Sequence, residues 1–478
     1  MKILFAASEV NPILKVGGIA DVVSALTKAL RKISRHDIRI VIPYYQLIKE
    51  KKFGGKKIAR FKVKIGAEEE VVNVYKIFLP KTDIPVYFLE NKKYLTNGGV
   101  YLDIKKFDHI KRFLFFSLAI PEFLKVIDWQ PDVIHAHDWQ AGFVPVILKL
   151  KKIKIKVLFT IHNLLTQGCW NSDEFLKFLG LKADFKKSND LNIMQQAILN
   201  ADLITTVSPN YAKEIKTKFY GRGLEKEIKS RSKDFSGILN GIDVDIFNPL
   251  TDRSLVRNYS IKNLEDKLFN KIYLQKKCGF EISKNIPLLG VISRLDEQKG
   301  IDLICEITDE LVENNCQMII LGTGQSECEK MVKEIQRKYP HNICFFVEFN
   351  PELAQQIYAG ADIFLMPSKF EPCGLCQMIA MRYGTIPIVR ATGGLRDTVK
   401  NVKLNNDLSG LNKRVIGNGF SFSDYNSQKF LVAIKRALNF YQNKKIWKKI
   451  QINAMSQDFS WHQSAKKYLK LYNKLISK

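Results

Sequence analysis

Short runs of apolar, mostly β-branched residues recur along the chain, and helical patterns separate them. The runs in the first half are KILFAAS, IRIVIP, VYFLE, DVIHAH, KVLFTIHN and DLITTVS, and those in the second half are PLLGVISR, QMIILG, ICFFVEF, DIFLMPS and TIPIVR. Strands that are apolar along nearly their whole length are typical of parallel sheets covered by helices on both faces. The pattern therefore predicts an α/β protein with two series of parallel strands, one in each half of the chain.

A polar segment at residues 248–266 separates the two series. The chain has 478 residues, which is too long for one ordinary core. We expect one Rossmann-like domain at residues 1–247 and a second at residues 248–458. The tail, residues 459–478, has Ala465, Tyr468, Leu469, Tyr472 and Leu475–Ile476 on one face, which predicts an amphipathic helix.

Polar and glycine-rich segments follow the predicted strands directly. They are KVGGIAD, HAHDWQAG, TIHNLLTQG, ILNGIDVDIFNP, SRLDEQKG, LGTGQ, PSKFEPCG and RATGGLRD. Open parallel sheets bind ligands at the carboxyl ends of their strands. We therefore expect loops from both domains to face one closable cleft, in which two substrates react.

Composition narrows the function classes only slightly. The formal net charge is +27, but the lysines are dispersed and no nucleic-acid-binding motif accompanies them. We therefore expect neither nucleic acid nor a membrane as a partner. An anion-binding structural protein, indicated by charge alone, stays as an alternative. Eight scattered cysteines, no long apolar run and no signal-peptide pattern favour a cytoplasmic protein.

Two cations and two glycine pairs suit a phosphate-bearing substrate. Arg294 and Lys299, just past a strand, could clamp a diphosphate and stabilise it as it leaves, or could be two exposed cations on a loop. Both should face the cleft, so we expect that replacing either one by Ala lowers turnover far more than stability. Gly393–Gly394 and Gly17–Gly18 could bring backbone close to an anion, or could serve plain turns.

Two histidines and an acid lie around the end of another strand. His135 and His137, two apart, could be a metal pair, but no third ligand has suitable spacing. Asp138 and Trp139 more closely fit a sugar-facing pair, with a carboxylate for hydroxyls and an aromatic face for a pyranose. His162, at the next strand end, fits a structural or a catalytic histidine equally well.

The stretch SKFEPCGLCQ, residues 368–377, combines an acid with a CxxC motif. Cys373 and Cys376 lack the second cysteine pair that zinc needs and the thioredoxin-like unit that redox chemistry needs. Glu371 follows a strand and precedes a Pro and a Gly. Its carboxylate could bind sugar hydroxyls or oppose an oxocarbenium ion.

Taken together and in order, these motifs resemble those of bacterial glycogen synthases and plant starch synthases. The resemblance covers essentially the whole chain and is most specific from FEPCGL to TGGLRDTV. It implies a GT-B architecture of two Rossmann-like domains, with the C-terminal helix 459–478 crossing back to the first domain. That domain would be on the acceptor side, and the second would bind the nucleotide sugar.

The resemblance also implies an activity. Glucose would pass from ADP-glucose to the non-reducing end of an α-1,4-glucan with retention of configuration, and no metal or other cofactor would be needed. The alternatives are the same fold using UDP-glucose or another acceptor, and a glucan-binding scaffold with weak catalysis.

Roles carry over to matching residues of this chain. The catalytic set is His162, Arg294, Lys299, Glu371 and Asp21. The substrate-binding set is Lys15, Gly17, Gly18, Asp138, Asn163, Asn240, Phe349, Cys373, Gly374, Leu375, Thr392, Gly393 and Gly394. Lys15 and Gly17–Gly18 would lie at the donor phosphates and glucose, and Phe349 where an aromatic ring stacks on adenine.

Some positions depart from the family pattern. Thr166 stands where Tyr or Phe is usual, which predicts a missing aromatic platform near the acceptor. Leu165 replaces a usual Ala, Gln355 a common His, and Lys369 a common Arg. None of these removes the predicted core cations or carboxylates.

Overall fold

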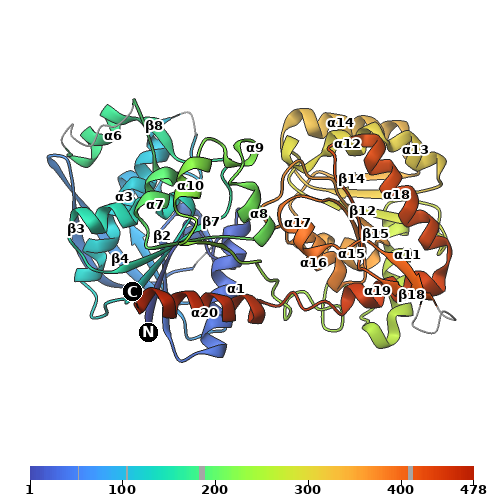
Figure 1. The fold of residues 1–478 in the computed structure, drawn as a ribbon, viewed down its shortest axis with the longest axis horizontal. Helices are drawn as coiled ribbons and strands as arrows, with labels where there is room; N and C mark the ends of the chain where they lie inside the picture. The colour runs from blue at the N-terminus through green and yellow to red at the C-terminus, as the bar shows by residue number, and fades with distance from the viewer. Residues whose placement is uncertain (52, 104–105, 182–188, 407–412, 478) are drawn as a thin grey trace. The chain divides into compact units, whose positions relative to one another are not determined.

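The computed structural model describes residues 1–51, 53–103, 106–181, 189–406 and 413–477. The chain separates into two compact units: Met1–Gly241 with Trp461–Lys478, and Ile242–Ser460 (Figure 1). We call them the N-terminal and the C-terminal unit. The division after Gly241 lies a few residues before the boundary expected from the sequence.

A nine-stranded sheet organises the N-terminal unit, in the order β11-β10-β7-β6-β1-β2-β5-β4-β3. Seven of its strands are parallel, as the apolar runs predicted. The strands are β1 Lys2–Ala6, β2 Asp37–Pro43, β3 Lys56–Ile65, β4 Glu68–Phe78, β5 Pro85–Glu90, β6 Val133–His137, β7 Lys156–Ile161, β10 Leu203–Thr206 and β11 Phe235–Gly237. A separate antiparallel pair joins β8 Cys169–Asn171 and β9 Asp190–Asn192.

The antiparallel strands β3 and β4 at the edge of this sheet were not predicted. Along β3, exposed lysines alternate with buried positions such as Phe61, Val63 and Ile65. Such alternation is typical of a strand with one face in solvent, whereas the strands predicted from the sequence were continuous apolar runs. Edge lysines also discourage pairing with another chain.

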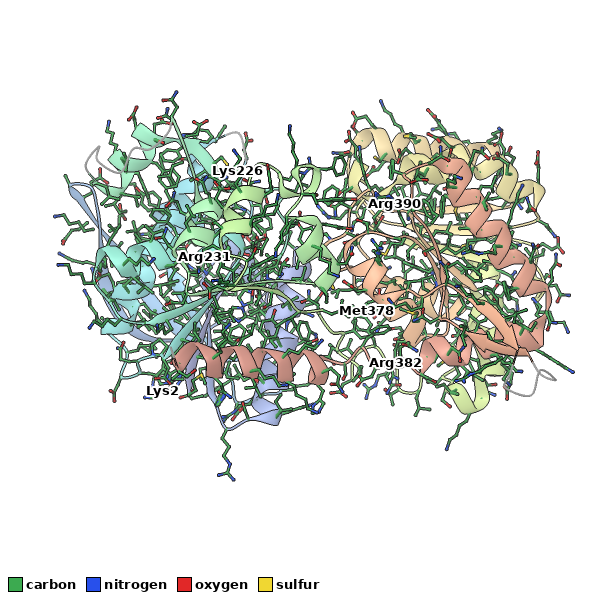
Figure 2. All side chains as sticks on the ribbon, in the orientation of Figure 1. Lys2, Lys226, Arg231, Met378, Arg382 and Arg390 are labelled. Carbon is green, nitrogen blue, oxygen red and sulfur yellow. The ribbon has the colours of Figure 1, made fainter. Side chains whose placement is uncertain are left out.

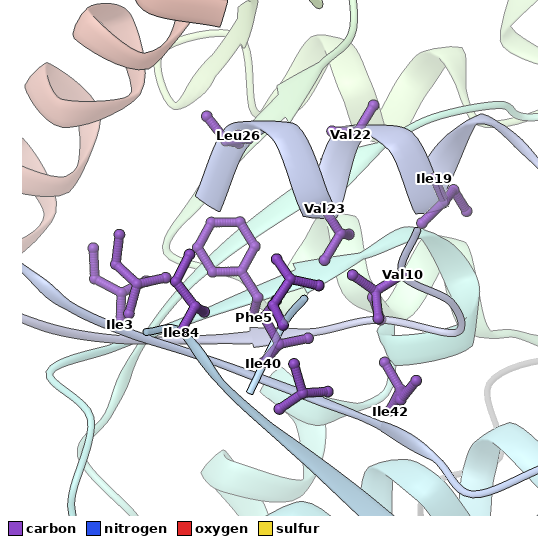
Figure 3. Packing of buried hydrophobic residues seen from close by; sticks show 14 of the residues in the cluster. Ile3, Phe5, Val10, Ile19, Val22, Val23, Leu26, Ile40, Ile42 and Ile84 are labelled. Atoms are coloured by element: carbon purple, nitrogen blue, oxygen red, sulfur yellow. The ribbon is translucent and has the colours of Figure 1, made fainter. Parts of the chain in front are cut away.

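Helices cover the N-terminal sheet. They are α1 Gly18–Ile33, α2 Gln46–Glu50, α3 Phe107–Lys125, α4 Asp138–Ala141, α5 Val144–Leu150, α6 Ser172–Leu179, α7 Ile193–Asn200, α8 Pro209–Glu214, α9 Lys218–Gly221, α10 Glu225–Ser230, α20 Trp461–Ile476 and the π-helix Lys92–Thr96. Figure 3 shows Val22, Val23 and Leu26 of α1 over the strand residues Phe5 and Ile40, all buried. Burying such side chains contributes about 1.5–3 kcal/mol each, which anchors the helix above the strand ends.

The last helix, α20, belongs to the N-terminal unit, which agrees with the GT-B prediction of a helix that crosses back. Its buried side chains include Ala465, Tyr468, Tyr472 and Leu475, as the amphipathic pattern predicted, whereas Ile476 is exposed. It packs beside α1. The chain thus returns to the first unit to cover the sheet.

A six-stranded parallel sheet organises the C-terminal unit, in the order β14-β13-β12-β15-β16-β19. Its strands are β12 Leu288–Ile292, β13 Gln317–Leu321, β14 Ile343–Phe346, β15 Ile363–Met366, β16 Ile386–Arg390 and β19 Phe420–Phe422, with an outlying pair β17 Lys403–Asn406 and β18 Lys413–Ile416. The helices are α11 Lys267–Lys277, α12 Ile301–Glu306, α13 Thr308–Glu313, α14 Ser326–Lys338, α15 Pro351–Gly360, α16 Cys376–Arg382, α17 Gly393–Thr398, α18 Ser427–Gln442 and α19 Lys444–Met455, with 3-10 turns at Ile261–Asp266 and Glu297–Lys299.

One core cluster of this unit joins α11 and α15 to the sheet through Leu274, Ile357, Leu288 and Ile319, all fully buried. The five apolar runs of the second half form β12 to β16 as predicted. All of these strands run in parallel. The loops that follow them therefore leave the same edge of the sheet.

Candidate active site

In the N-terminal unit, the loop between β1 and α1 is held by a buried acid, Glu9. Its carboxylate accepts hydrogen bonds from the N–H of Val16 and of Gly17, the latter at 3.0 Å, and from the Tyr101 hydroxyl at 3.1 Å. Burial raises the pKa of Glu9, and the bonds from Gly17 and Val16 oppose that rise. Sequence reasoning missed Glu9, although an acid directly after a buried strand was a usable signal.

The hydrogen bonds to Glu9 change the role that was expected of Gly17 and Gly18. The Gly17 N–H is donated to Glu9, and a Cβ on Gly17 would lie 3.1 Å from a carboxylate oxygen of Glu9. A Cβ on Gly18 would meet nothing within 4 Å. Gly17 therefore shapes the loop, while the space in front of the α1 N-terminus is open at Gly18.

Lys15 and Asp21 are brought together beside this opening. The Lys15 ammonium lies 2.7 Å from one Asp21 oxygen, and Asn11 donates to the other at 3.0 Å. The side chains are 36% and 23% exposed. The cation is thus accessible and oriented, and an anionic ligand could share it with Asp21.

His135 is a structural residue. Its ring nitrogens bond to the Tyr472 hydroxyl of α20 at 2.8 Å and to the Thr160 hydroxyl of β7 at 2.6 Å. Both nitrogens are therefore occupied, which ties α20 to the sheet. Over the part of the chain that the structure describes, no group of three or more His, Cys, Asp or Glu side chains has an arrangement that could hold a metal ion.

His137 and His162 meet at the ends of β6 and β7. His137 Nδ1 lies 3.0 Å from His162 Nε2. Burial lowers the pKa of His162 to about 3 and that of His137 well below its ordinary value. Both imidazoles are therefore neutral at pH 7.

Asp138 has the most unusual backbone of the predicted residues. Its φ is +56°, in the left-handed region that non-glycine residues rarely adopt. It is 4% exposed, and the backbone N–H groups of His162, Asn163 and Trp139 lie near its carboxylate and favour its charged form. Its Oδ1 atom is buried with no hydrogen-bond partner among the described residues. Burial nevertheless raises its pKa to about 8. Strain of this kind is concentrated at functional sites.

The prediction that Trp139 offers an aromatic face to a sugar is wrong. The side chain is 2% exposed and packs edge-on against His109 and Phe113, with ring centroids 5.1 and 5.0 Å away. A Cβ on Gly168 would lie 2.4 Å from the indole. Trp139 sits one residue into α4, where the helix turns it into the core.

Two asparagines complete the N-terminal set. Asn163 is half-buried, and its side-chain oxygen accepts the Leu165 N–H at 3.0 Å, which shapes the loop after His162. Asn240 is 5% exposed, and its side-chain oxygen is a buried acceptor with no partner among the described residues. A buried amide oxygen without a hydrogen-bond partner is a candidate to accept a hydrogen bond from a ligand hydroxyl.

In the C-terminal unit, Lys299 and Glu371 form a buried ion pair. The Lys299 ammonium lies 2.6 Å from Glu371 Oε2, and the side chains are 16% and 8% exposed. Ser368 donates to the same oxygen at 3.2 Å. The loops after β12 and β15 therefore converge, and a cation lies directly beside the carboxylate.

Glycine makes that convergence possible. Gly300 has φ +71°, and a Cβ there would lie 2.5 Å from the Pro367 carbonyl oxygen. The Gln298 side chain donates to the Phe370 carbonyl at 3.1 Å, and the Lys369 N–H donates to the Gln298 carbonyl at 2.8 Å. Gln298 is a further positioning residue that sequence reasoning missed.

The structure does not pair Arg294 with Glu371. Its side chain is 66% exposed and lies 3.4 Å from Asp296. Of the two predicted clamp cations, Lys299 is thus held inside the loop pair and Arg294 projects into solvent.

The segment Thr392–Gly394 packs on the segment that contains Glu371. A Cβ on Gly393, which has φ +43°, would lie 1.9 Å from the Glu371 carbonyl oxygen, and one on Gly394 would lie 2.2 Å from the Cys373 carbonyl oxygen. The Gly394 N–H donates to the Glu371 carbonyl at 3.1 Å. These glycines therefore permit close backbone packing, and the N–H of Gly394 is already used within the protein.

Further contacts fix the turn at residues 373–375. Gly374 has φ +71°, and the buried Gln377 donates to the carbonyls of Cys373 and Gly374 at 3.2 and 3.0 Å. Leu375 directly precedes α16. Arg390, labelled in Figure 2, donates to the Lys369 carbonyl at 3.0 Å. Cys373 is buried and Cys376 is half-buried, and neither forms a disulfide.

Phe349 is 76% exposed, although it is a large apolar side chain. It lies in the loop between β14 and α15. A ring as exposed as this gains little free energy from burial within the protein. Its exposed face suits stacking against the ring of a ligand. The role stays a prediction.

The departures from the family pattern occupy different environments. Thr166 and Leu165 are exposed, Leu165 by 52%. Gln355 accepts a hydrogen bond from the Ser254 hydroxyl at 3.0 Å, which serves the fold. The Lys369 ammonium lies 5.7 Å from the centre of the Tyr425 ring.

A hollow of about 830 Å³ adjoins Asp296 and Lys369. Its lining also includes Glu297, Asp302 and Glu327. That excess of carboxylates does not suit a diphosphate.

Comparison with known proteins identifies the family. Residues 2–230 match the model described as starch synthase catalytic domain, and residues 276–453 match that of glycosyl transferases group 1. The chain is 44% identical to a glycogen synthase of Thermosipho melanesiensis over 100% of both chains. The chain belongs to the glycogen synthase and starch synthase family. It is 42% identical to a glycogen synthase of Clostridium perfringens, covering 100% of this chain and 98% of that one.

Solved structures agree with this family and its GT-B fold. The catalytic domain of starch synthase IV from Arabidopsis thaliana, bound to ADP and acarbose, matches with a TM-score of 0.89 and 33% identity over 100% of this chain and 99% of that one. A sucrose-phosphate synthase from Thermosynechococcus elongatus, at 16% identity and a TM-score of 0.64, shares the fold. The chain is therefore a glycosyltransferase. None of its described helices combines the length and apolarity of a membrane span.

Proposed function

We propose that this chain transfers glucose from ADP-glucose to the non-reducing end of an α-1,4-glucan with retention of configuration. The observation that carries the proposal is the Lys299–Glu371 pair, in which the two groups are 2.6 Å apart. The ammonium is suited to a diphosphate that gains charge as it leaves, and the carboxylate to the hydroxyls of the sugar attached to it. The Lys299–Glu371 pair is thus suited to bind both the diphosphate and the sugar of a nucleotide sugar.

Cationic side chains take the part that a metal ion has in other glycosyl transfers. Lys299 is fixed by its ion pair, while the exposed Arg294 is free to turn onto a phosphate as a bidentate donor. Lys15 and the N-terminus of α1 offer a further cation and a helix dipole. We therefore propose that the transfer needs no metal.

Glu371 orients the glucose ring rather than attacking it. Its carboxylate is already bound by Lys299 and Ser368, which lowers its nucleophilicity. Retention then follows from attack on the same face from which the diphosphate departs. The leaving phosphate oxygen takes the proton of the acceptor hydroxyl as the new glycosidic bond forms.

The N-terminal residues bind sugar hydroxyls. Asp138, with a pKa of about 8, can act as acceptor or donor near neutral pH, whereas the neutral His162 provides one donor or one acceptor. The Arabidopsis relative, which binds ADP and acarbose, supports an adenine nucleotide and a glucan-like ligand. We also propose a cytoplasmic location, which eight cysteines outside any disulfide support.

The test is nucleoside diphosphate release by the purified protein with glycogen, comparing ADP-glucose with UDP-glucose, with and without EDTA. Glycogen-dependent ADP release that survives EDTA is the expected result. Preference for UDP-glucose would overturn the donor, and loss of activity in EDTA would overturn metal independence. Release from neither donor by a folded protein that binds glycogen would make it a glucan-binding scaffold.

A further inference from the structure

His137 is held rigidly at the end of β6. Its ring stacks on Phe5, with centroids 5.4 Å apart and planes at 22°, and lies 4.1 Å from the ring of His135. The side chain is fully buried. Stacking fixes the plane of the imidazole, and the Nδ1 edge of the ring faces His162.

Strand register brings that edge to His162. His137 pairs with Thr160 across the parallel strands β6 and β7, and His162 follows two residues later, on the same side as Thr160. The resulting Nδ1–Nε2 separation is 3.0 Å, a normal hydrogen-bond length. One of the two nitrogens must carry the shared proton.

Two neutral arrangements satisfy this contact. In the first, His137 donates from Nδ1 and His162 accepts at Nε2, so His162 keeps its own proton on Nδ1. In the second, His162 donates from Nε2, and His137 must carry its proton on Nε2. A charged pair is disfavoured because burial lowers the pKa of both rings.

The surroundings of His137 Nε2 decide between them. This atom is buried and has no hydrogen-bond partner among the described residues. The second arrangement would place an N–H there with no acceptor, and orphaned buried N–H groups are rarer than orphaned acceptors. The first arrangement leaves only a lone pair.

We propose that His137 is a positioning residue that donates from Nδ1 to Nε2 of His162 and thereby fixes His162 as an Nδ1–H donor. His162 is half-buried at the end of its strand. The importance of this for turnover rests on the proposed function, in which His162 contacts the sugar. His162 then gives a hydrogen bond to a substrate oxygen and does not act as a base.

The first test is nitrogen NMR of the unliganded, full-length protein labelled with ¹⁵N-histidine, with His162 assigned from the signals lost in His162→Gln. A protonated Nδ1 and an unprotonated Nε2 on His162 are expected. A protonated Nε2 on His162 would overturn the proposal. This readout needs no substrate, so it is decisive even if the protein transfers no glucose.

The second test separates positioning from packing. His137→Leu removes the donor, and we expect mixed His162 tautomers with turnover lower by about 10–100-fold. His137→Asn places an amide N–H close to the Nδ1 position and should restore most of the loss. Thr205→Val, which removes the 2.6 Å contact to Thr160 in the same buried layer, is the matched control and should leave the His162 signals unchanged.

The variants also separate the two hypotheses. If folded His137→Asn is no better than His137→Leu in tautomer and turnover, the positioning role is wrong. If the wild-type protein shows the expected tautomer but transfers no glucose, the proposed function fails while the assignment of the proton stands.

Discussion

In the C-terminal unit the buried carboxylate of Glu371 has a cation 2.6 Å away, whereas in the N-terminal unit the buried Asp138 side chain lies near the backbone N–H groups of His162, Asn163 and Trp139. The consequence for ionisation is large, because burial raises the pKa of Asp138 to about 8. The histidines beside Asp138 are likewise kept neutral. The surroundings of Glu371 thus hold opposite charges in contact, and those of Asp138 hold neutral donors and acceptors.

The difference between the surroundings of Glu371 and those of Asp138 corresponds to two kinds of ligand group, a charged diphosphate and neutral hydroxyls. A compensated ion pair beside the exposed Arg294 can exchange partners when a diphosphate arrives, since the cations are already charged. Neutral groups on a strained backbone suit hydroxyls, which carry no charge to compensate. The comparison predicts that mutations in the two units differ in kind as well as in size.

Lys299→Ala should have the largest effect. We expect turnover to fall by about 10²–10³-fold, because charge on the leaving diphosphate loses its nearest donor. Stability should also fall, by about 3–5 kcal/mol, since Glu371 is left buried without its cation. Arg294→Ala, at a side chain that is 66% exposed, should lower turnover with a stability change within about 0.5 kcal/mol. Turnover assays and urea unfolding measure both, and equal stability losses would contradict the assignment.

Asp138→Asn should change how stability depends on pH. The pKa of Asp138 is raised from 3.8 to about 8 on folding, so the unfolded chain releases a proton between these values and the folded protein does not. Wild-type stability therefore falls as pH rises from about 4 to 8 and then levels off. The variant lacks this contribution, so its stability relative to wild type should rise on the order of 5 kcal/mol across that range, at about 1.4 kcal/mol per pH unit. Urea unfolding at several pH values measures it, and a difference that falls with pH would contradict the raised pKa.

Gly393→Ala compared with Gly18→Ala tests where glycine is needed for packing. The added Cβ at Gly393 would lie 1.9 Å from the Glu371 carbonyl, at a φ of +43°, so we expect a loss of about 3 kcal/mol. At Gly18 the added Cβ meets nothing within 4 Å, and the change should stay within about 1 kcal/mol. Thermal unfolding of the two variants measures the contrast. Similar losses at both sites would rule out a packing role specific to Gly393.

Glu9→Gln should have the smallest effect of the four. The amide can accept at one atom only. Val16 and Gly17 both donate to Oε2, and Gly17 also donates to Oε1 at 3.1 Å, so with the amide oxygen at Oε2 the second Gly17 contact loses its acceptor, at a cost of about 1–2 kcal/mol. We expect the KM for the nucleotide sugar to rise about tenfold with kcat nearly unchanged, because the loop that carries Lys15 loosens. Steady-state kinetics measures it, with the exposed Glu50→Gln as control. A fall in kcat alone would argue against a loop-anchoring role.

Much of the fold followed from the apolar runs, because near-continuous apolar strands have few alternatives to a covered parallel sheet. The edge hairpin β3–β4 did not, since its lysines alternate with buried positions. Among site residues, motif position indicated Glu371 and Lys299, but not the contact between them. Glu9 and Gln298 escaped notice because they act by holding loops, and nothing in their own sequence shows what they hold.

By itself, the sequence determined the two series of strands, the amphipathic C-terminal helix and the family, because these depend on residue type and order along the chain. Tertiary structure alone decided that Trp139 faces the core, that Gly17 donates its N–H to Glu9, and that Asp138 is strained and buried. The reason is physical: burial, pKa and hydrogen-bond partners depend on segments far apart in the sequence. His137 and His162 are 25 residues apart, and only the pairing of β6 with β7 makes them neighbours.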